Sequence, residues 1–229
     1  MGFGIFLGVI AFALSLLVSW RFKSKVAKYS QITLRNGLSG REIAEKMLQD
    51  HKIYDVKVIS VEGKLTDHYN PLDKTVNLSP DVYAGNSVIS AAVAAHECGH
   101  AVQHAQAYSW LTMRSKLVPV VSLTSQYVQW ILLAGVLLIN RFPGLLLIGI
   151  MVFALTTLFS FITLPVEFDA SRRALAWLDN KHIVETSEHE NSKDALKWAA
   201  MTYVIAAVSS LATLLYYVSI YLNRGSSRD

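Results

Sequence analysis

One short segment of the sequence combines residue types that bind metals and transfer protons: His96-Glu97-Cys98-Gly99-His100. Two histidines four residues apart lie on one face of a helix, about one turn apart. Both imidazoles can therefore reach one zinc ion at about 2.0–2.1 Å. Glu97 lies beside the pair, where it can take a proton from zinc-bound water and pass it to the leaving amine. The pattern predicts a zinc metallopeptidase with His96 and His100 as ligands and Glu97 as the catalytic base.

A catalytic zinc ion keeps three protein ligands and one open position, so a third ligand must come from elsewhere. Glu167 is the best candidate, because two apolar segments separate it from His100 and return it to the same side of a membrane. If the chain around it is helical, Asp169 points about 200° away from Glu167, whereas Ser171 shares its face. The alternative for Glu167 is a carboxylate that marks the end of a membrane span.

Other polar residues could assist this site. His68 and Tyr69 could donate to the oxyanion of the tetrahedral intermediate, although each is equally compatible with a turn. His104, Ser171 and Arg172 could support the ligands from outside the coordination sphere. His104 also fits a solvent-facing histidine, and Arg172 fits a basic anchor at a membrane surface.

The segment that carries the motif is expected to be a small α+β unit. Ser39 and Glu42 fit a capping box that begins a helix ending near Asp50. Gly99 would allow close backbone packing beside the metal, and Cys98 is expected to be a small packing residue. The remaining expected elements are a strand at 55–61, strands at 64–66 and 74–78 paired around a 67–71 turn, and a helix at about 87–108 that carries the motif. The substrate is expected to lie along the 74–78 strand.

The composition does not fit an ordinary soluble domain. Of the 229 residues, 52% are hydrophobic and only 17% are charged, whereas soluble domains average about 25% charged residues. The single cysteine excludes an internal disulfide framework and a cysteine-based zinc finger. The chain is therefore expected to be a membrane protein.

Four long stretches contain no charged residue, and each exceeds or equals the roughly 20 residues needed to span a bilayer as a helix. We therefore predict a multi-pass α-helical membrane protein with four transmembrane helices and a small zincin-like α+β catalytic unit. The predicted domain boundaries are spans at 1–20, 117–140, 142–166 and 198–223, cytoplasmic segments at 21–116 and 167–197, and a tail at 224–229.

The basic residues predict the orientation in the membrane. Five Lys or Arg residues occupy positions 21–35, before the first acidic residue at Glu42. By the positive-inside rule, the N-terminus is outside and the active site is on the cytoplasmic side of a plasma membrane. Arg224 and Arg228 in the tail weigh mildly against this orientation. The expected partners are the lipid bilayer and a peptide or membrane-protein substrate, and no nucleic acid, because no stacking aromatics accompany the basic run.

Three motifs in this order resemble the bacterial membrane neutral zinc metallopeptidase family, the YugP-like proteins. The motifs are Leu65-Thr66-Asp67-His68-Tyr69-Asn70-Pro71, Ala95-His96-Glu97-Cys98-Gly99-His100-Ala101-Val102-Gln103 and Pro165-Val166-Glu167-Phe168-Asp169-Ala170-Ser171. The resemblance covers nearly the whole chain and implies a gluzincin-type zinc endopeptidase, with His96, His100 and Glu167 as ligands and Glu97 as base. The related HtpX-like and Ste24-like peptidases have Asp four residues after the third-ligand Glu, where this sequence has Ser171.

Two other readings compete with this one. In a site-2-type intramembrane protease the motif helix itself would cross the bilayer. Asp81 and three histidines make 87–107 a poor span, and Asn70-Pro71-Leu72-Asp73 precedes the motif instead of following it. The other reading is a non-catalytic membrane scaffold, which would bind zinc without hydrolysing peptides.

Overall fold

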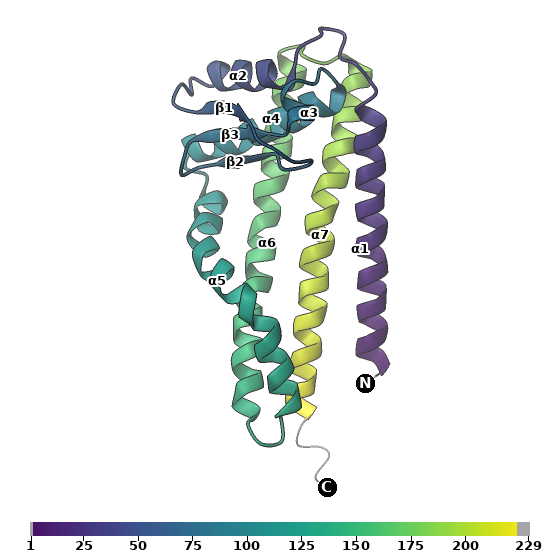
Figure 1. Ribbon diagram of the computed structural model, residues 1–229, viewed down its shortest axis with the longest axis vertical. Coiled ribbons are helices and arrows are strands. Elements are labelled where there is room, and N and C mark those ends of the chain that lie inside the picture. Colours follow the sequence, from purple (N-terminus) through teal and green to yellow (C-terminus); the bar gives the residue numbers. More distant parts are fainter. Residues whose placement is uncertain (1, 224–229) are drawn as a thin grey trace. The chain divides into compact units, whose positions relative to one another are not determined.

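The computed structural model describes the backbone of residues 2–223 and the side chains of residue 6 and residues 8–223. Most of this part of the chain is helical (Figure 1). In the sequence, the three strands of one small sheet follow the second helix and precede the third. The elements are α1 (Gly2–Tyr29), α2 (Gly40–Asp50), β1 (Lys57–Ser60), β2 (His68–Asn70), β3 (Thr75–Leu78), α3 (Pro80–Tyr83), α4 (Val88–Ala105), α5 (Ser109–Leu137), α6 (Pro143–Asn180) and α7 (Thr186–Leu222).

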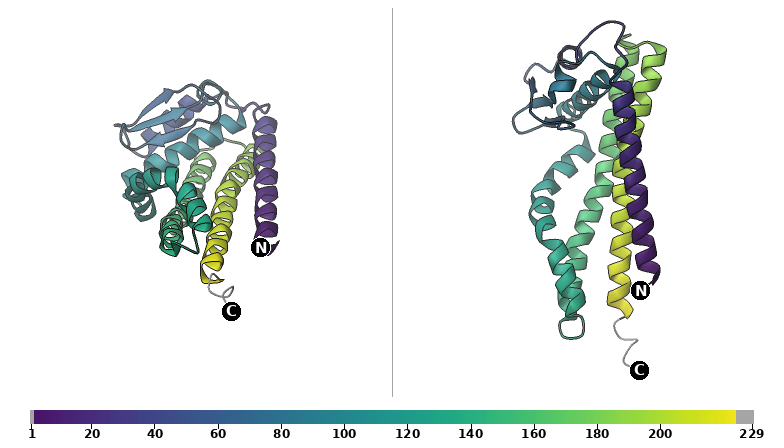
Figure 2. Two further views of the ribbon diagram at one scale, coloured as in Figure 1. Left: turned by 60° about the horizontal axis from the view of Figure 1, so that its bottom comes forward. Right: turned by 45° about the vertical axis from the view of Figure 1, so that its right-hand side comes forward.

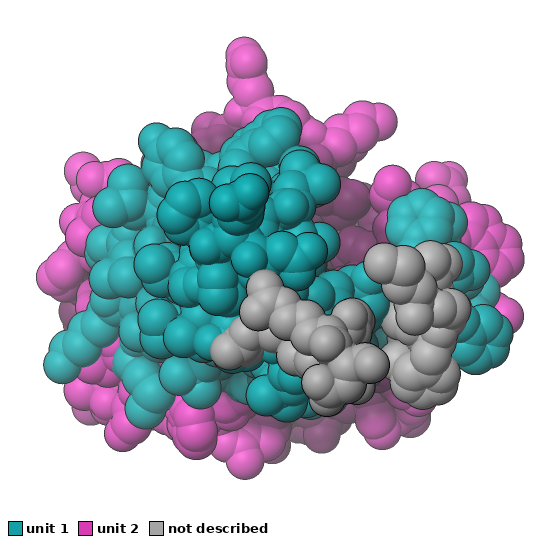
Figure 3. Space-filling model, turned by 90° about the horizontal axis from the view of Figure 1, so that it is seen from below, with its two compact units in different colours: residues 1–17, 113–164, 203–229 teal, residues 18–112, 165–202 magenta. Residues whose placement is uncertain are grey.

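The chain divides into two compact units, which Figure 3 shows in different colours. Unit 1 consists of residues 1–17, 113–164 and 203–229, and unit 2 consists of residues 18–112 and 165–202. Unit 2 contains the sheet, the motif helix and Glu167, so all of the predicted metal ligands belong to one unit.

Unit 1 is built from apolar helices. Within the described residues, three helices are long and apolar enough to cross a membrane: α5, α6 and α7. The motif helix α4 is not among them. The predicted span at 1–20 falls on α1, but residue 1 and the side chains of residues 2–5 and 7 lie outside the described part, so this span stays a prediction. The predicted tail at 224–229 also lies outside it.

Helices α5 and α6 pack closely within unit 1. A Cβ atom added to Gly135 would lie 2.6 Å from the Cα atom of Leu146, so the glycine permits this approach. Val128, Leu132, Leu146 and Ile150 form the buried core between these two helices. Thr157 and Ser210 share a hydrogen bond of 2.6 Å that joins α6 to α7. In hydrocarbon, such small and hydroxyl-bearing residues are the groups that hold helices together.

The predicted capping box at the start of α2 is confirmed. The Ser39 side chain accepts a hydrogen bond from the Glu42 backbone, and the Glu42 carboxylate accepts from the Ser39 backbone N–H at 2.8 Å. Ile43 and Met47 of α2 are fully buried, together with Ala91 and Ala95 of α4. Figure 2 shows α2, α4 and the sheet side by side in unit 2.

The sheet has the order β1-β3-β2, with β1 parallel and β2 antiparallel to β3. The predicted strand at 57–60 is confirmed within the expected 55–61 range, but the predicted pairing of 64–66 around a 67–71 turn is wrong. Leu65 and Gly63 have φ of 57° and 110°, a left-handed backbone that a strand cannot contain. The strand is His68–Asn70, and the turn begins at Asn70, whose Oδ1 accepts from the backbone N–H of Leu72 and Asp73.

The central position of β3 in the sheet contradicts the expected binding of a substrate along this strand. Both edges of β3 are hydrogen-bonded, to β1 and to β2. The predicted binding of a substrate along 74–78 is therefore wrong, because an added strand needs a free sheet edge. The free edges of this sheet belong to β1 and β2.

Candidate metal centre

Helix α4 presents the two motif histidines together. Its N-cap is Ser87, whose side chain accepts from the Ser90 backbone N–H, and the helix continues without interruption to Ala105. The rings of His96 and His100 lie edge to face, with centroids 4.9 Å apart. The spacing of four residues therefore places both imidazoles at one site, as the sequence predicts.

The carboxylate of Glu167 on α6 meets both imidazoles. Its Oε2 lies 3.3 Å from His96 Nε2 and 3.7 Å from His100 Nε2. The ligand atoms of the three residues all lie within 4.8 Å of one another, and Glu167 is only 3% exposed. Zinc bonds of about 2.1 Å in tetrahedral geometry separate neighbouring ligand atoms by about 3.4 Å. This donor set of two imidazoles and one carboxylate fits a zinc ion.

Gly99 explains how α6 approaches α4 closely enough for this contact. A Cβ atom at Gly99 would lie 2.7 Å from the carbonyl oxygen of Ala170 and 3.1 Å from its Cα. Both atoms are backbone atoms of α6, so no flexible side chain can move aside. The predicted role of Gly99 in close backbone packing is confirmed.

Glu97 and Cys98 occupy the turn between the ligand histidines. Glu97 is 8% exposed and does not belong to the group of three metal-binding side chains. The pKa of its carboxyl is raised to about 7, mainly by burial and also by the charges of Glu167 and Asp67, against the lowering effect of His96. The Cys98 thiol is fully buried, and burial raises its pKa, so this residue packs in the core as expected.

Of the three residues predicted to support the ligands, Ser171 contacts a ligand histidine, whereas Arg172 and His104 contact other residues. Ser171 Oγ is 3.2 Å from Nδ1 of His96, on the side of the ring away from Glu167. Arg172 contacts Asp169 and is otherwise largely exposed. The structure does not bring His104 to the ligands, because its Nδ1 hydrogen-bonds the Tyr69 hydroxyl at 2.8 Å.

His68 belongs to the edge strand β2 and is exposed. Its Nδ1 lies 2.7 Å from the Thr66 carbonyl oxygen, which can only accept, so Nδ1 carries the proton. The charge of His68 is close enough to Glu97 to lower the pKa of that carboxyl. Of the two residues predicted to stabilise an oxyanion, His68 has its Nε2 without an assigned hydrogen bond, while the Tyr69 hydroxyl already has His104 as a partner.

Sequence reasoning missed two buried polar residues at this site. Gln103 is completely buried and contacts His100, and Asp169 is 5% exposed and contacts Gln103. The sequence places Asp169 only on the helix face away from Glu167. The available signal was the position of Gln103, three residues after His100 on the same helix face.

Comparison with known proteins agrees with this geometry. The family described as "Putative neutral zinc metallopeptidase" matches residues 4–222. The chain belongs to this family. It is 41% identical over 219 residues to the "Putative membrane protease YugP" of Bacillus subtilis (strain 168), and the match covers 96% of each chain. No solved structure matches the chain. For a member of the neutral zinc metallopeptidase family, the group formed by His96, His100 and Glu167 is the expected kind of metal site.

Proposed function

We propose that this chain is a membrane-embedded zinc metalloendopeptidase that hydrolyses peptide bonds at the cytoplasmic face of the plasma membrane. The observation that carries the proposal is the carboxylate of Glu167, 3.3 Å and 3.7 Å from the Nε2 atoms of His96 and His100. Membership of a zinc metallopeptidase family and the position of Glu97 between the two histidines support it.

His96, His100 and Glu167 would hold the zinc ion. When bound, zinc lowers the pKa of a water molecule and polarises the scissile carbonyl group. Glu97 would take the proton of the attacking water and donate it to the leaving amine. The Nδ1–H of His68 is used by Thr66, so His68 could donate to the oxyanion only from a protonated Nε2.

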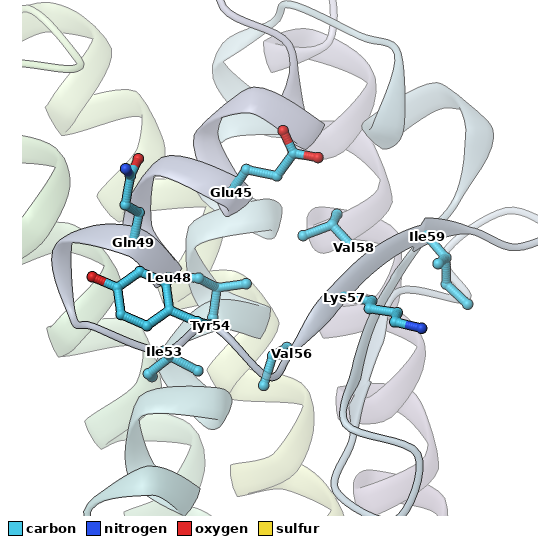
Figure 4. Close-up of a pocket in the computed structure, with 9 residues that line it drawn as sticks. All are labelled: Glu45, Leu48, Gln49, Ile53, Tyr54, Val56, Lys57, Val58 and Ile59. Carbon is cyan, nitrogen blue, oxygen red and sulfur yellow. The ribbon is translucent and has the colours of Figure 1, made fainter.

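The substrate would lie along the free edge of β2. Helix α4, which carries the ligands, packs against β2 and β3, whereas the other edge strand, β1, packs against α2 and α3. A cavity of about 490 Å³ beside β1 is lined by Glu45, Leu48, Ile53, Tyr54 and their neighbours, and Figure 4 shows no histidine among them. The β1 cavity therefore has no histidine ligand beside it, whereas a peptide added to β2 would run beside the catalytic helix.

A second cavity of about 720 Å³ would receive a substrate side chain. It is lined by Leu65, which precedes β2, and by Ile89 and Val93 of α4, among others. Val93 precedes His96 by one helical turn, so the cavity continues the face of α4 that bears the ligands. Half of its lining is polar or charged, including Lys23, Lys64 and Asp81, so it would receive a substrate side chain that has both an apolar part and a polar end.

The first test combines metal content with peptide cleavage by the purified full-length protein. Glu97→Gln should keep zinc, because residue 97 is not a ligand, and should lose cleavage by about 10²–10⁴-fold, because the proton carrier is gone. Glu167→Ala should lose both zinc and cleavage. Mass spectrometry of bound metal and cleavage of a labelled peptide give the two readouts.

The control is Glu45→Gln, an exposed carboxylate that pairs with Arg41. It should match the wild type in both measurements. Cleavage that is unchanged in Glu97→Gln would remove the peptidase assignment. Zinc binding without any cleavage by the wild type, and indifference to Glu97→Gln, would favour the non-catalytic scaffold.

A further inference from the structure

The amide of Gln103 has a single orientation that satisfies its contacts. Its Nε2 lies 2.8 Å from the carbonyl oxygen of Val166 and 2.9 Å from Oδ2 of Asp169. Both partners are acceptors, so the end of the amide that faces them must be the NH₂ group, which has two protons to donate. Because Gln103 is fully buried, no water can substitute for these partners.

This orientation determines which atom faces His100. The Oε1 of Gln103 lies 3.1 Å from Nδ1 of His100. An amide oxygen only accepts, so Nδ1 of His100 must carry the proton. A neutral imidazole protonated at Nδ1 has its lone pair on Nε2, the atom that faces the Glu167 carboxylate. The lone pair is therefore directed toward the metal position.

The other ligand histidine lacks such a constraint. Nδ1 of His96 faces the hydroxyl of Ser171 at 3.2 Å, and a hydroxyl can either donate or accept. This contact is compatible with both tautomers of His96. Of the two ligand histidines, only His100 has its tautomer fixed by a partner that cannot donate.

Asp169 stabilises the Gln103 amide from α6. Its buried carboxylate also accepts from Nε of Arg173 at 2.5 Å and contacts Arg172. Arg173 in turn donates to Gln106, the residue that follows α4, at 2.6 Å. Two cations compensate the burial of this carboxylate, so it can remain ionised and act only as an acceptor toward Gln103.

We infer that Gln103 and Asp169 are positioning residues that hold His100 as the Nδ1–H tautomer and so keep its Nε2 ready to bind the metal. Neither residue is a ligand or touches a substrate. The inference rests on the metal site of the proposed function, but it does not depend on peptide hydrolysis.

The direct test is the tautomer of His100 in metal-free, full-length protein with ¹⁵N-labelled histidine, assigned by comparison with His100→Gln. The wild type should show a protonated Nδ1 at His100, because Nδ1 faces the Gln103 amide oxygen. Its Nε2 faces the Glu167 carboxylate and can also be protonated while no metal is bound. A protonated Nε2 with a bare Nδ1 would overturn the inference, and this measurement needs no variant at position 103.

Three variants then test the consequence for metal binding, measured as the zinc dissociation constant by competition with a chelator. Gln103→Leu removes the acceptor and should weaken zinc binding about 10–100-fold, as loss of a supporting partner of a ligand histidine typically does. Asp169→Asn keeps an oxygen that accepts from the Gln103 amide and should retain most of the affinity. Gln106→Leu is the matched control, since Gln106 is exposed and contacts Arg173 instead of a ligand; its affinity should stay within about twofold.

Zinc affinity in folded Gln103→Leu equal to that of the wild type would overturn the inference, as would equal loss in Gln103→Leu and Asp169→Asn. Failure of the proposed function has a different signature. If Glu97→Gln cleaves like the wild type, the peptidase assignment fails, while the His100 tautomer and the zinc affinities still test the role of Gln103.

Discussion

Helices α4 and α6, which carry the ligands, contact each other both through side chains and through backbone atoms. Side chains such as Gln103 and Ser171 contact the imidazoles and can adjust by rotation. Gly99 and Ala170 meet through backbone atoms, which cannot. The distance between Glu167 and the histidines is therefore controlled by the smallest residue in the motif rather than by the ligands themselves.

Gly99→Ala tests this at the scale of one methyl group. The added Cβ would lie 2.7 Å from the Ala170 carbonyl oxygen, so the helices must separate. We expect the free energy of unfolding to fall by about 1–3 kcal/mol, as for overpacked sites, and zinc binding to weaken because the carboxylate moves away. Chemical unfolding in detergent and chelator competition provide the measurements.

Gly144→Ala is the matched control, because a Cβ atom there would meet nothing within 4 Å. It should bind zinc like the wild type and unfold within about 0.5 kcal/mol of it. Wild-type zinc affinity in Gly99→Ala would show that the α4–α6 approach does not set the ligand geometry.

Among the elements, the parts predicted from the sequence are those with local signals. The spacing of His96 and His100 on a helix and the capping box at Ser39 each depend on residues within a few positions. The missing side chain of Gly99 is also a local signal of close packing, although its partner Ala170 is distant in the sequence. Glu167 could be singled out because counting the spans returned it to the side of the motif. The structure brings its carboxylate to the two imidazoles.

The parts that could not be predicted depend on pairings distant in sequence or on backbone dihedrals. Alternation of polar and apolar residues does not show that Leu65 is left-handed or that the Asn70 side chain starts the turn. The strand order β1-β3-β2 follows from packing, and it reverses the expected role of the 74–78 strand. The contact between Gln103 and Asp169, 66 residues apart, could not be predicted, although the position of Gln103 on the helix face of His100 could be read from the sequence.

The carboxylate of Asp67, just before the edge strand β2, hydrogen-bonds Ser79, just after β3. Asp67 Oδ1 accepts from the Ser79 backbone N–H at 2.7 Å and from the Ser79 hydroxyl at 3.0 Å. Hydrogen bonds to a charged group contribute about 1.5–3 kcal/mol. Loss of this carboxylate should leave β2 less well ordered, which matters if β2 is the strand that binds the substrate.

Asp67→Ala should therefore raise KM for a peptide about tenfold, because about 1.4 kcal/mol of ordering is lost. Zinc content should not change, because Asp67 is not a ligand. Steady-state kinetics and metal analysis of the same preparation give both values. Asp55→Ala is the control, since that carboxylate pairs with Lys74 at an exposed position and should leave KM unchanged. A wild-type KM in Asp67→Ala would argue against substrate binding at β2.

At the scale of the whole molecule, the proposed function depends on the side of the membrane on which the metal site lies. The proposal places unit 2 in the cytoplasm because basic residues are concentrated after the first apolar run. The ligands would then act on peptides or on the cytoplasmic ends of membrane proteins. In the reverse orientation, the same metal site would act on peptides outside the cytoplasm.

The single cysteine makes this orientation measurable. Cys98 is fully buried, and Cys98→Ala gives a background without thiols. New cysteines would be placed at three exposed positions: Arg141→Cys between α5 and α6, Glu62→Cys before β2, and Glu190→Cys near the start of α7.

In intact cells, a membrane-impermeant maleimide should label position 141 only, and positions 62 and 190 should react after permeabilisation. Each variant must retain zinc, so that labelling reports the folded protein. Labelling of 62 and 190 but not 141 in intact cells would place the metal site outside and overturn the cytoplasmic assignment.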